Sequence, residues 1–273
     1  MQFKHCGRHS GGRSAPSNHI MKRISLLCLI AALTAAHSPA QTAAGKRVLV
    51  YTRQTTGSYI HENAPSSVEA IRKMGAQNGF AVDASEDPSV FTAGNLKQYS
   101  ALIFSNTNSQ AFQTDAQREA FQDYIQGGGG FVGLHAATTT ERQWPFFVST
   151  IGGKFLRHPA LQKFVVTVKD ATHPSTRGLP ASFEWEDECY FHDSLNPDLH
   201  PLLFADPSKL DDPDRGKFAS SLIDGNVPLA WTITTGGRRV FYTALGHKSE
   251  TYSNPLLVGH ILGGVLWAMG AAE

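Results

Sequence analysis

The chain has 273 residues and a nearly balanced charge, with 24 Lys and Arg residues against 23 Asp and Glu residues. This length is enough for one domain with a sizeable core. The balanced charge argues against a nucleic-acid partner, which favours a basic face. Three cysteines are too few for a disulfide framework, so the packing of apolar side chains has to stabilise the fold.

The first 40 residues are expected to be an upstream extension and a secretory signal peptide. Residues 1–20 are polar and basic, and Met21 is the expected start of translation. The charged Lys22, the apolar run ISLLCLIAALTAA and the small residues that end at Ala40 follow in the order of a signal peptide. A membrane anchor is the alternative, but the apolar run is short for a membrane span. We therefore expect a bacterial periplasmic or secreted protein whose mature chain, residues 41–273, is a single domain that does not bind membranes.

Removing this segment changes the charge and the cysteine count. The segment holds five basic and no acidic residues, which leaves 19 basic against 23 acidic residues and a net charge of −4. This negative charge again argues against a nucleic-acid partner. Cys189 is then the only cysteine, so it has no internal disulfide partner even though an oxidising compartment would permit one.

The first half of the mature chain alternates strands with helices. Continuous apolar runs such as residues 46–52 are typical of strands that are covered on both faces. One helix begins with a capping box formed by Thr114 and Gln117 and ends at Gly127. The expected order is strand 46–52, helix 65–78, strands 80–85 and 101–106, helix 114–127 and strand 130–135. This order predicts an α/β fold in which a mainly parallel sheet carries helices on both faces.

The second half is rich in strands with short connections. Its last two strands flank Gly236 and Gly237, which form a hairpin signal. Residues 255–270 are an apolar closing helix, and His260 inside it is expected to be structural. The expected strands cover residues 163–170, 182–193, 201–206, 228–235 and 238–247. Because there is no internal repeat, one domain with an added β-rich second half is the simplest organisation.

Residues 133–137 have the spacing of a nucleophile elbow, in which a strand turns sharply into a helix. Such a turn needs very small residues two places before and two places after its centre, because the backbone folds tightly there. Gly133 and Ala137 meet that need. The centre is His135, where a hydrolase or an amidotransferase would carry serine or cysteine. The spacing therefore predicts a reaction centre whose usual nucleophile is missing.

Three histidines follow the carboxyl ends of expected strands. His61 lies in the long loop after the first strand, His135 ends the elbow strand, and His247 ends the last hairpin strand. Ligands of open parallel sheets gather beyond these strand ends, so the three imidazoles are expected at one rim. Each of them taken alone is more often an ordinary hydrogen-bonded polar residue.

The strand expected over residues 182–193 adds an acid, a phenol and another imidazole. Period-two alternation gives one face to Glu186, Glu188, Tyr190 and His192. That face could bind a sugar or a metal, and a solvated charged face is the alternative interpretation. Cys189 faces away from Glu188 and Tyr190, so it is expected to pack rather than react, and its replacement should leave activity intact.

Several motifs follow one another in a recognisable order: GGGFVGLHAAT, Trp144, GGKFLRHP, HPSTRGLP, DECY, PLAW and GRRVFYTALGH. Together they resemble the ThuA-like family, which is named from bacterial trehalose utilisation and related to class I glutamine amidotransferases. The resemblance implies a three-layer α/β/α flavodoxin-like fold without the amidotransferase cysteine. By motif it points to His61, His135, His158, Glu188, Tyr190 and His247. The amidotransferase pair of a histidine and an acid one residue apart is not reproduced, because Lys248, Ser249 and Glu250 follow His247.

The resemblance also implies a role in carbohydrate turnover, with oxidised (keto) sugars as substrates and a functional link to a sugar oxidoreductase. The leading hypothesis is an exported hydrolase, lyase or isomerase that acts on a sugar or keto-sugar. His135 would be its general acid or base, assisted by Glu188 and by His61 or His247. Three further residues would bind the substrate: Tyr190, His158 and Trp144.

Two other hypotheses use the same fold. The first is a zinc site with ligands among His61, His135, Glu188 and His247, since imidazole and carboxylate groups are common zinc ligands. No HExxH-type local spacing supports it. The second is a non-catalytic sugar-binding module that kept the fold and lost the chemistry, and the missing nucleophile is its main support. In every case the expected partner is a small carbohydrate.

Overall fold

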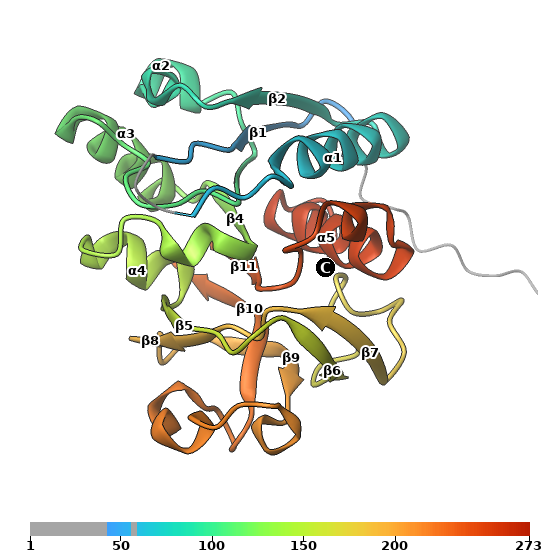
Figure 1. Ribbon diagram of the computed structural model, residues 1–273. Coiled ribbons are helices and arrows are strands. Elements are labelled where there is room, and N and C mark those ends of the chain that lie inside the picture. The colour runs from blue at the N-terminus through green and yellow to red at the C-terminus, as the bar shows by residue number, and fades with distance from the viewer. Residues whose placement is uncertain (1–42, 56–58) are drawn as a thin grey trace, which may run out of the picture. The chain divides into compact units, whose positions relative to one another are not determined.

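The computed structural model describes residues 43–55 and 59–273, so the expected signal peptide lies outside the described residues. The large sheet contains β1 (Arg47–Tyr51), β2 (Ala81–Ser85), β3 (Ala101–Ser105), β4 (Gly130–Leu134), β6 (Gln162–Val168), β7 (Ser182–Asp187), β9 (His200–Ala205), β10 (Val227–Thr235) and β11 (Arg238–Thr243). Its strand order is β2-β1-β3-β4-β11-β10-β9-β6-β7 (Figure 1). A second, two-stranded sheet pairs β5 (Lys154–Arg157) with β8 (Phe191–Asp193).

The large sheet changes from parallel to antiparallel pairing after β11. β1 pairs in parallel with β2 and β3, β3 with β4, and β4 with β11. This block has the order 2-1-3-4-5 of flavodoxin-like sheets, with β11 as the fifth strand. β10, β9, β6 and β7 then continue the sheet in antiparallel pairs. The predicted α/β fold with a β-rich second half is confirmed.

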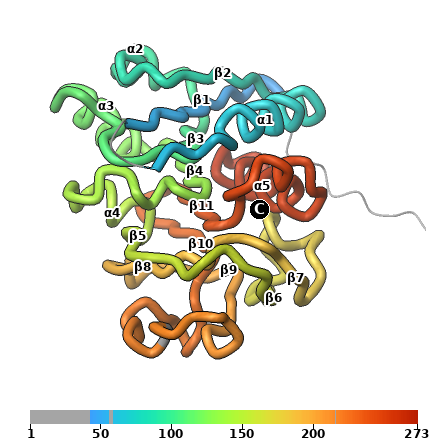
Figure 2. Tube along the Cα trace, viewed as in Figure 1, coloured from blue at the N-terminus to red at the C-terminus, as the bar shows by residue number. Residues whose placement is uncertain are grey.

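Helices cover both faces of the parallel block, which gives the predicted three layers (Figure 2). The helices are α1 (Ala64–Asn78), α2 (Ala93–Leu96), α3 (Asp115–Gln126), α4 (Pro145–Ile151) and α5 (Pro255–Ala268). Ile71 of α1 and Ile261 of α5 belong to one buried apolar cluster. Phe121 of α3 and Phe147 of α4 belong to the other. Within the described residues, every helix is too short or too polar to cross a membrane.

Two strands end earlier than the sequence pattern indicates. The single strand predicted over residues 182–193 is wrong, because the chain leaves the large sheet after Asp187 and re-enters a strand at Phe191 in the small sheet. The strand predicted over residues 238–247 ends at Thr243. In both cases the residues beyond the strand end are free to turn towards the carboxyl edge of the parallel block, where the functional candidates lie. Periodicity also gives no indication of α4 or β5.

Gly263 of α5 makes a close backbone approach that can be tested. A Cβ atom at this position would overlap the Pro174 carbonyl group and the Ser175 Cα, whereas a Cβ atom at Gly259 would meet nothing within 4 Å. We expect Gly263→Ala to lower the free energy of unfolding by about 1–3 kcal/mol, the usual effect of overpacking. Gly259→Ala is the matched control and should be neutral or stabilising by about 0.5–1 kcal/mol, because alanine favours the helix. Urea denaturation measures both, and equal effects would contradict the close approach.

The buried His260 makes stability depend on pH. Its Nδ1–H donates to the Ser175 carbonyl oxygen at 2.9 Å, and burial lowers the pKa of its ring to about 4. The unfolded chain titrates near 6.5, so it binds the extra proton first, and stability falls as the pH falls from 6.5 towards 4. We expect this one group to remove about 2 kcal/mol of unfolding free energy between pH 7 and pH 5. His260→Gln should reduce the pH dependence measured by urea denaturation by about that amount, and an unchanged dependence would refute the assignment.

Candidate functional site

The site begins at the sharp turn that follows β4. His135 has a φ of 48°, in the left-handed region, and opens a short 3-10 helix over His135–Thr139. A Cβ atom on Gly133 would lie 2.8 Å from the Ile151 side chain and 3.3 Å from the Ala137 Cβ. The predicted need for a very small residue at position 133 is therefore confirmed. The turn presents an imidazole where an elbow enzyme presents a serine or a cysteine.

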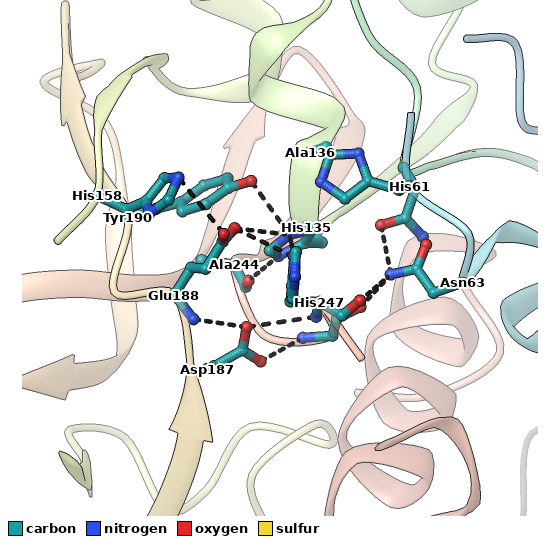
Figure 3. A network of polar contacts seen from close by, with 12 residues as sticks. His61, Asn63, His135, Ala136, His158, Asp187, Glu188, Tyr190, Ala244 and His247 are labelled. Atoms are coloured by element: carbon teal, nitrogen blue, oxygen red, sulfur yellow. Dashed lines mark hydrogen bonds and ion pairs between the residues drawn. The ribbon is translucent and has the colours of Figure 1, made fainter. Parts of the chain in front are cut away.

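Hydrogen bonds determine the tautomer and the direction of the buried His135 ring. Its Nδ1–H donates to the carbonyl oxygen of Ala244 at 2.6 Å. Because a carbonyl oxygen only accepts, the proton of the neutral ring is on Nδ1, and Nε2 carries a lone pair. The hydroxyl group of Tyr190 donates to Nε2 at 3.1 Å. His135 therefore presents a basic nitrogen to the residues gathered around it (Figure 3).

Three more side chains meet near that nitrogen. Oε2 of Glu188 lies 3.6 Å from His135 Nε2 and 3.2 Å from His247 Nδ1. The two imidazole nitrogens, His247 Nδ1 and His135 Nε2, are 3.3 Å apart. The ring centroid of His61 is 5.0 Å from that of His135. One ligand-type atom from each of these four residues lies within 4.8 Å of the other three. The chain segments that follow β1, β4, β7 and β11 thus deliver one histidine or carboxylate each to the same place.

Burial and mutual contacts set the charges in this four-residue cluster. Burial of Glu188 disfavours its ionised form, but its contacts with His135 and His247 outweigh burial and hold the pKa of the carboxyl below its usual value. The hydrogen bond to Glu188 raises the pKa of His247. Burial, followed by the neighbouring histidines, lowers the pKa of His61 to about 3. Near neutral pH the cluster therefore holds a neutral His61 beside a carboxylate.

The donor atoms of the cluster fit a divalent cation such as zinc. His61 Nδ1 is buried and, among the described residues, has no hydrogen-bond partner. His135 Nε2 has a lone pair directed into the cluster, and Glu188 adds an anionic oxygen. Imidazole nitrogen and carboxylate oxygen are common zinc ligands, so the predicted ligand set of His61, His135, Glu188 and His247 is chemically suitable.

A cavity of about 890 Å³ opens beside the cluster. His61 and Glu188 line part of it. The rest of the lining combines aromatic with polar side chains, among them Trp144, Phe155, Asn108, Gln110 and Arg142. The volume is within the range of small-molecule sites, and this mixture of aromatic and polar groups suits a small polar ligand.

Comparison with known families places the chain in one of them. The family model ThuA, described as trehalose utilisation, matches residues 47–268. The chain belongs to the ThuA family. The sequence matches no curated protein.

Solved structures support this ThuA assignment. A ThuA-like protein from Bacteroides uniformis ATCC 8492 is 26% identical, with a TM-score of 0.67 over 82% of this chain and 91% of that chain. A ThuA-like protein from Parabacteroides merdae ATCC 43184 is 21% identical, with a TM-score of 0.63 over 83% of this chain and 91% of that chain. A cytoplasmic protein from Salmonella typhimurium LT2 is 13% identical, with a TM-score of 0.54 over 82% and 98% of the two chains, and shares the fold alone.

The three residues predicted to bind substrate in this ThuA protein all line the cavity. His158 Nε2 lies 3.5 Å from Glu188 Oε1, and its Nδ1–H donates to the Pro159 carbonyl oxygen at 2.7 Å. The ring of Tyr190 stacks with that of His158 at a centroid distance of 5.6 Å. Trp144 is half-buried at the cavity wall. The geometry brings the three together with the cluster, and their roles in binding stay predictions.

Two residues that alternation places beside Glu188 lie elsewhere, because the strand breaks after residue 187. Glu186 is exposed on β7, and its carboxylate pairs with Lys248 at 2.9 Å. His192 is buried on β8, where its Nε2 lies 3.2 Å from the hydroxyl oxygen of Tyr242. The prediction that all of these side chains share one face is therefore wrong.

Residues that support the cluster from behind carry almost no sequence signal. The hydroxyl group of Tyr242 donates to the His135 carbonyl oxygen at 2.8 Å. Asp187 is fully buried, and its carboxylate accepts the backbone N–H groups of Glu188 and His247. Strand alternation assigns Asp187 to the face away from the site. Its place in the DECY motif, next to Glu188, is the one feature of the sequence that could have singled it out.

Cys189 is packed in the apolar core, as its predicted orientation away from Tyr190 requires. It belongs to the buried cluster that contains Phe191, whereas Tyr190 belongs to the other cluster. Burial raises the pKa of its thiol well above the usual value, so the reactive thiolate is suppressed. We expect Cys189→Ala to keep ligand binding and any turnover of the wild type, and the native thiol to resist iodoacetamide. Loss of function in a folded Cys189→Ala variant would show that the thiol takes part in the chemistry.

Proposed function

We propose that this ThuA protein is an enzyme of carbohydrate turnover that acts on a sugar or keto-sugar with the help of a divalent cation, zinc in the first instance. The observation that carries the proposal is the convergence of His61, His135, Glu188 and His247 at the cavity, with ligand-type atoms within 4.8 Å of one another. A buried polar atom without a partner is unfavourable. Coordination of a cation would give the unpaired Nδ1 of His61 a partner.

A bound zinc ion would supply Lewis acidity towards a carbonyl or hydroxyl oxygen of the sugar. The side chains around the cluster would hold and orient the sugar. Trp144 and Tyr190 offer aromatic surfaces at the cavity wall. His158 lies outside the four-residue cluster, with Nε2 3.5 Å from Glu188, and is placed to exchange a proton with the sugar. Elimination and isomerisation need a proton removed beside the carbonyl of a keto-sugar, and hydrolysis needs one delivered to the leaving oxygen.

The hydrogen bond from the Tyr190 hydroxyl group to His135 Nε2 favours a second candidate. In this candidate no cation is involved, and His135 itself is the general acid or base. Glu188 and His247 would assist it, because a carboxylate hydrogen-bonded to an imidazole stabilises the protonated ring. Both candidates use the same cavity and the same sugar chemistry. They differ in whether the lone pair of His135 Nε2 binds a cation or a proton.

His135→Asn separates the two candidates. If a cation is bound, wild-type protein purified without affinity metals should contain nearly one equivalent of zinc by elemental analysis. The variant should then lose the zinc and at least about a hundredfold in turnover of keto-disaccharides. If His135 is the acid or base, neither protein should contain metal. The variant should then still bind its sugar and lose turnover by the same factor, because an amide does not titrate near neutral pH.

His200→Asn is the matched control for this experiment. His200 is exposed, pairs with Asp170 at 3.0 Å and does not line the cavity, so its replacement should change neither metal content nor turnover. Wild-type zinc content together with wild-type turnover in His135→Asn would refute both candidates. Sugar binding by wild-type protein with no turnover of keto-disaccharides or their parent sugars would indicate a non-catalytic binding module instead.

We also propose that the protein acts in the periplasm or outside the cell. The order of charged, apolar and small residues between Met21 and Ala40 supports this location. A keto-sugar arises by oxidation of a sugar hydroxyl group, so a sugar oxidoreductase is the enzyme we propose as the functional partner. The net charge of −4 after removal of residues 1–40 supports a small carbohydrate rather than a nucleic acid as the ligand.

A further inference from the structure

Asp187 lies at the end of β7 and is fully buried. Its Oδ1 accepts the backbone N–H of Glu188 at 2.9 Å and that of His247 at 3.3 Å. Its Oδ2 accepts the indole N–H of Trp185 at 2.9 Å and the backbone N–H of Gly246 at 2.8 Å. Each oxygen therefore receives two N–H donors, which fills the capacity of an ionised carboxylate.

These hydrogen bonds join two parts of the sheet that do not pair with each other. β7 is an edge strand, and β10, β9 and β6 separate it from β11. Glu188 follows β7, and His247 follows β11, so the two residues have no strand pairing to fix their separation. Lys248 and Glu186 form an ion pair between the same segments, but Glu186 is exposed and Lys248 only half-buried, so solvent screens the pair. The carboxylate of Asp187 provides a buried connection between the two backbones (Figure 3).

We infer that Asp187 is a positioning residue that holds Glu188 and His247 at the distance their shared chemistry requires. The inference rests on the proposed function for what the cluster does, and on the hydrogen bonds of Asp187 for how the cluster is held. Asp187 acts through the backbone N–H groups of its two neighbours and does not itself touch the ligand. Asparagine cannot take its place, because the NH₂ group would face two of the four N–H donors and leave them without an acceptor.

Asp187→Asn in the full chain is the test of this inference. The probe is cobalt(II), whose absorption bands report binding to the cluster directly. We expect the folded variant to bind cobalt(II) about 10–100-fold more weakly, the usual effect of removing a group that orients metal ligands. On a keto-sugar substrate, kcat should fall by a similar factor while KM changes little, because the cavity wall is intact. Wild-type cobalt affinity and wild-type kcat in the folded variant would overturn the inference.

Glu184→Gln is the matched control. Glu184 is on the same strand, and its exposed carboxylate pairs with Lys163 at 3.1 Å. It is not one of the four cluster residues. This variant removes one negative charge from β7, as Asp187→Asn does. We expect it to bind cobalt(II) and to turn over substrate like the wild type. An equal loss in both variants would mean that charge on β7, rather than the position of Glu188 and His247, is responsible, and would overturn the inference.

Imidazole spectra of the metal-free protein separate this inference from the proposed function. Long-range ¹H–¹⁵N correlation spectra report the tautomer and hydrogen bonding of each histidine ring. We expect Asp187→Asn to shift the signals of His135 and His247. His173 and His260 serve as internal references. Both rings bond to Ser175 rather than to a cluster residue, so their signals should not move. Unchanged His247 signals would overturn the inference. Shifted signals in a protein that neither binds cobalt(II) nor turns over sugars would leave Asp187 as a positioning residue and refute the proposed function.

Trp185→Phe is the second variant if Asp187→Asn does not fold. It removes one of the four donors and keeps the carboxylate. We expect cobalt affinity to fall about threefold to tenfold, which corresponds to the loss of one hydrogen bond, and the His247 signals to shift less than in Asp187→Asn. Unchanged affinity together with unchanged imidazole spectra would overturn the inference.

Discussion

The site depends on the parallel pairing of β4 with β11. The register of this pair sets Leu134 beside Thr243 at the last rung of both strands. His135 and Ala244 therefore leave the sheet side by side, and the His135 Nδ1–H reaches the Ala244 carbonyl oxygen at 2.6 Å. Because this bond takes the Nδ1 proton, the sheet itself determines which nitrogen of His135 points towards Glu188 and His247. His247 arrives at the same place because it continues the chain from β11.

Several residues at the site have a strained, left-handed backbone conformation. Among the described residues, six non-glycine residues have a positive φ, and three of them lie at the site: Ser109, His135 and Glu141. A left-handed conformation of this kind costs about 1–2 kcal/mol, so it persists only where the surroundings hold it. At His135 the hydroxyl group of Tyr242 bonds the carbonyl oxygen of the strained residue. At Glu141 the carboxylate accepts the backbone N–H groups of Ala111 and Phe112. At both positions, contacts of the strained residue itself hold its left-handed conformation.

The convergence of His61, His135 and His247 is predictable from sequence because it depends only on strand order and direction. The position of Glu188 is predictable only in part. The stretch SFEWEDECYFHD alternates without interruption, yet β7 pairs with β6 in the large sheet and β8 with β5 in the small one. The break between them is set by these distant pairings, which a local pattern does not contain. Asp187 escapes prediction for the same reason, since its four donors come partly from a segment about 60 residues away.

Helix α4 is a second element that the local sequence pattern does not predict. Its sequence PFFVSTI is rich in residues that favour strands. It is nevertheless helical between Pro145 in the first turn and Gly152, which takes a left-handed φ of 99° at the carboxyl end. Phe147 and Ile151 then pack under the parallel block, so burial against the sheet outweighs the intrinsic preference of the segment. The short helix carries Trp144 at its amino end and thereby closes one wall of the cavity.

The two halves of the sheet contribute different chemical groups to the cluster. The parallel block delivers the three imidazoles, and the antiparallel extension delivers the carboxylate of Glu188. In an elbow enzyme with serine or cysteine, the turn delivers the nucleophile and another strand delivers its base. Here the turn itself delivers a nitrogen base, so the group that complements it is an anion, which can share either a proton or a cation with imidazole. Glu188, 3.6 Å from His135 Nε2 and 3.2 Å from His247 Nδ1, is that anion. In other elbow enzymes this turn carries a nucleophile. On the proposed function, the turn here carries a base, His135, which binds a proton or a cation together with Glu188 from the added strands.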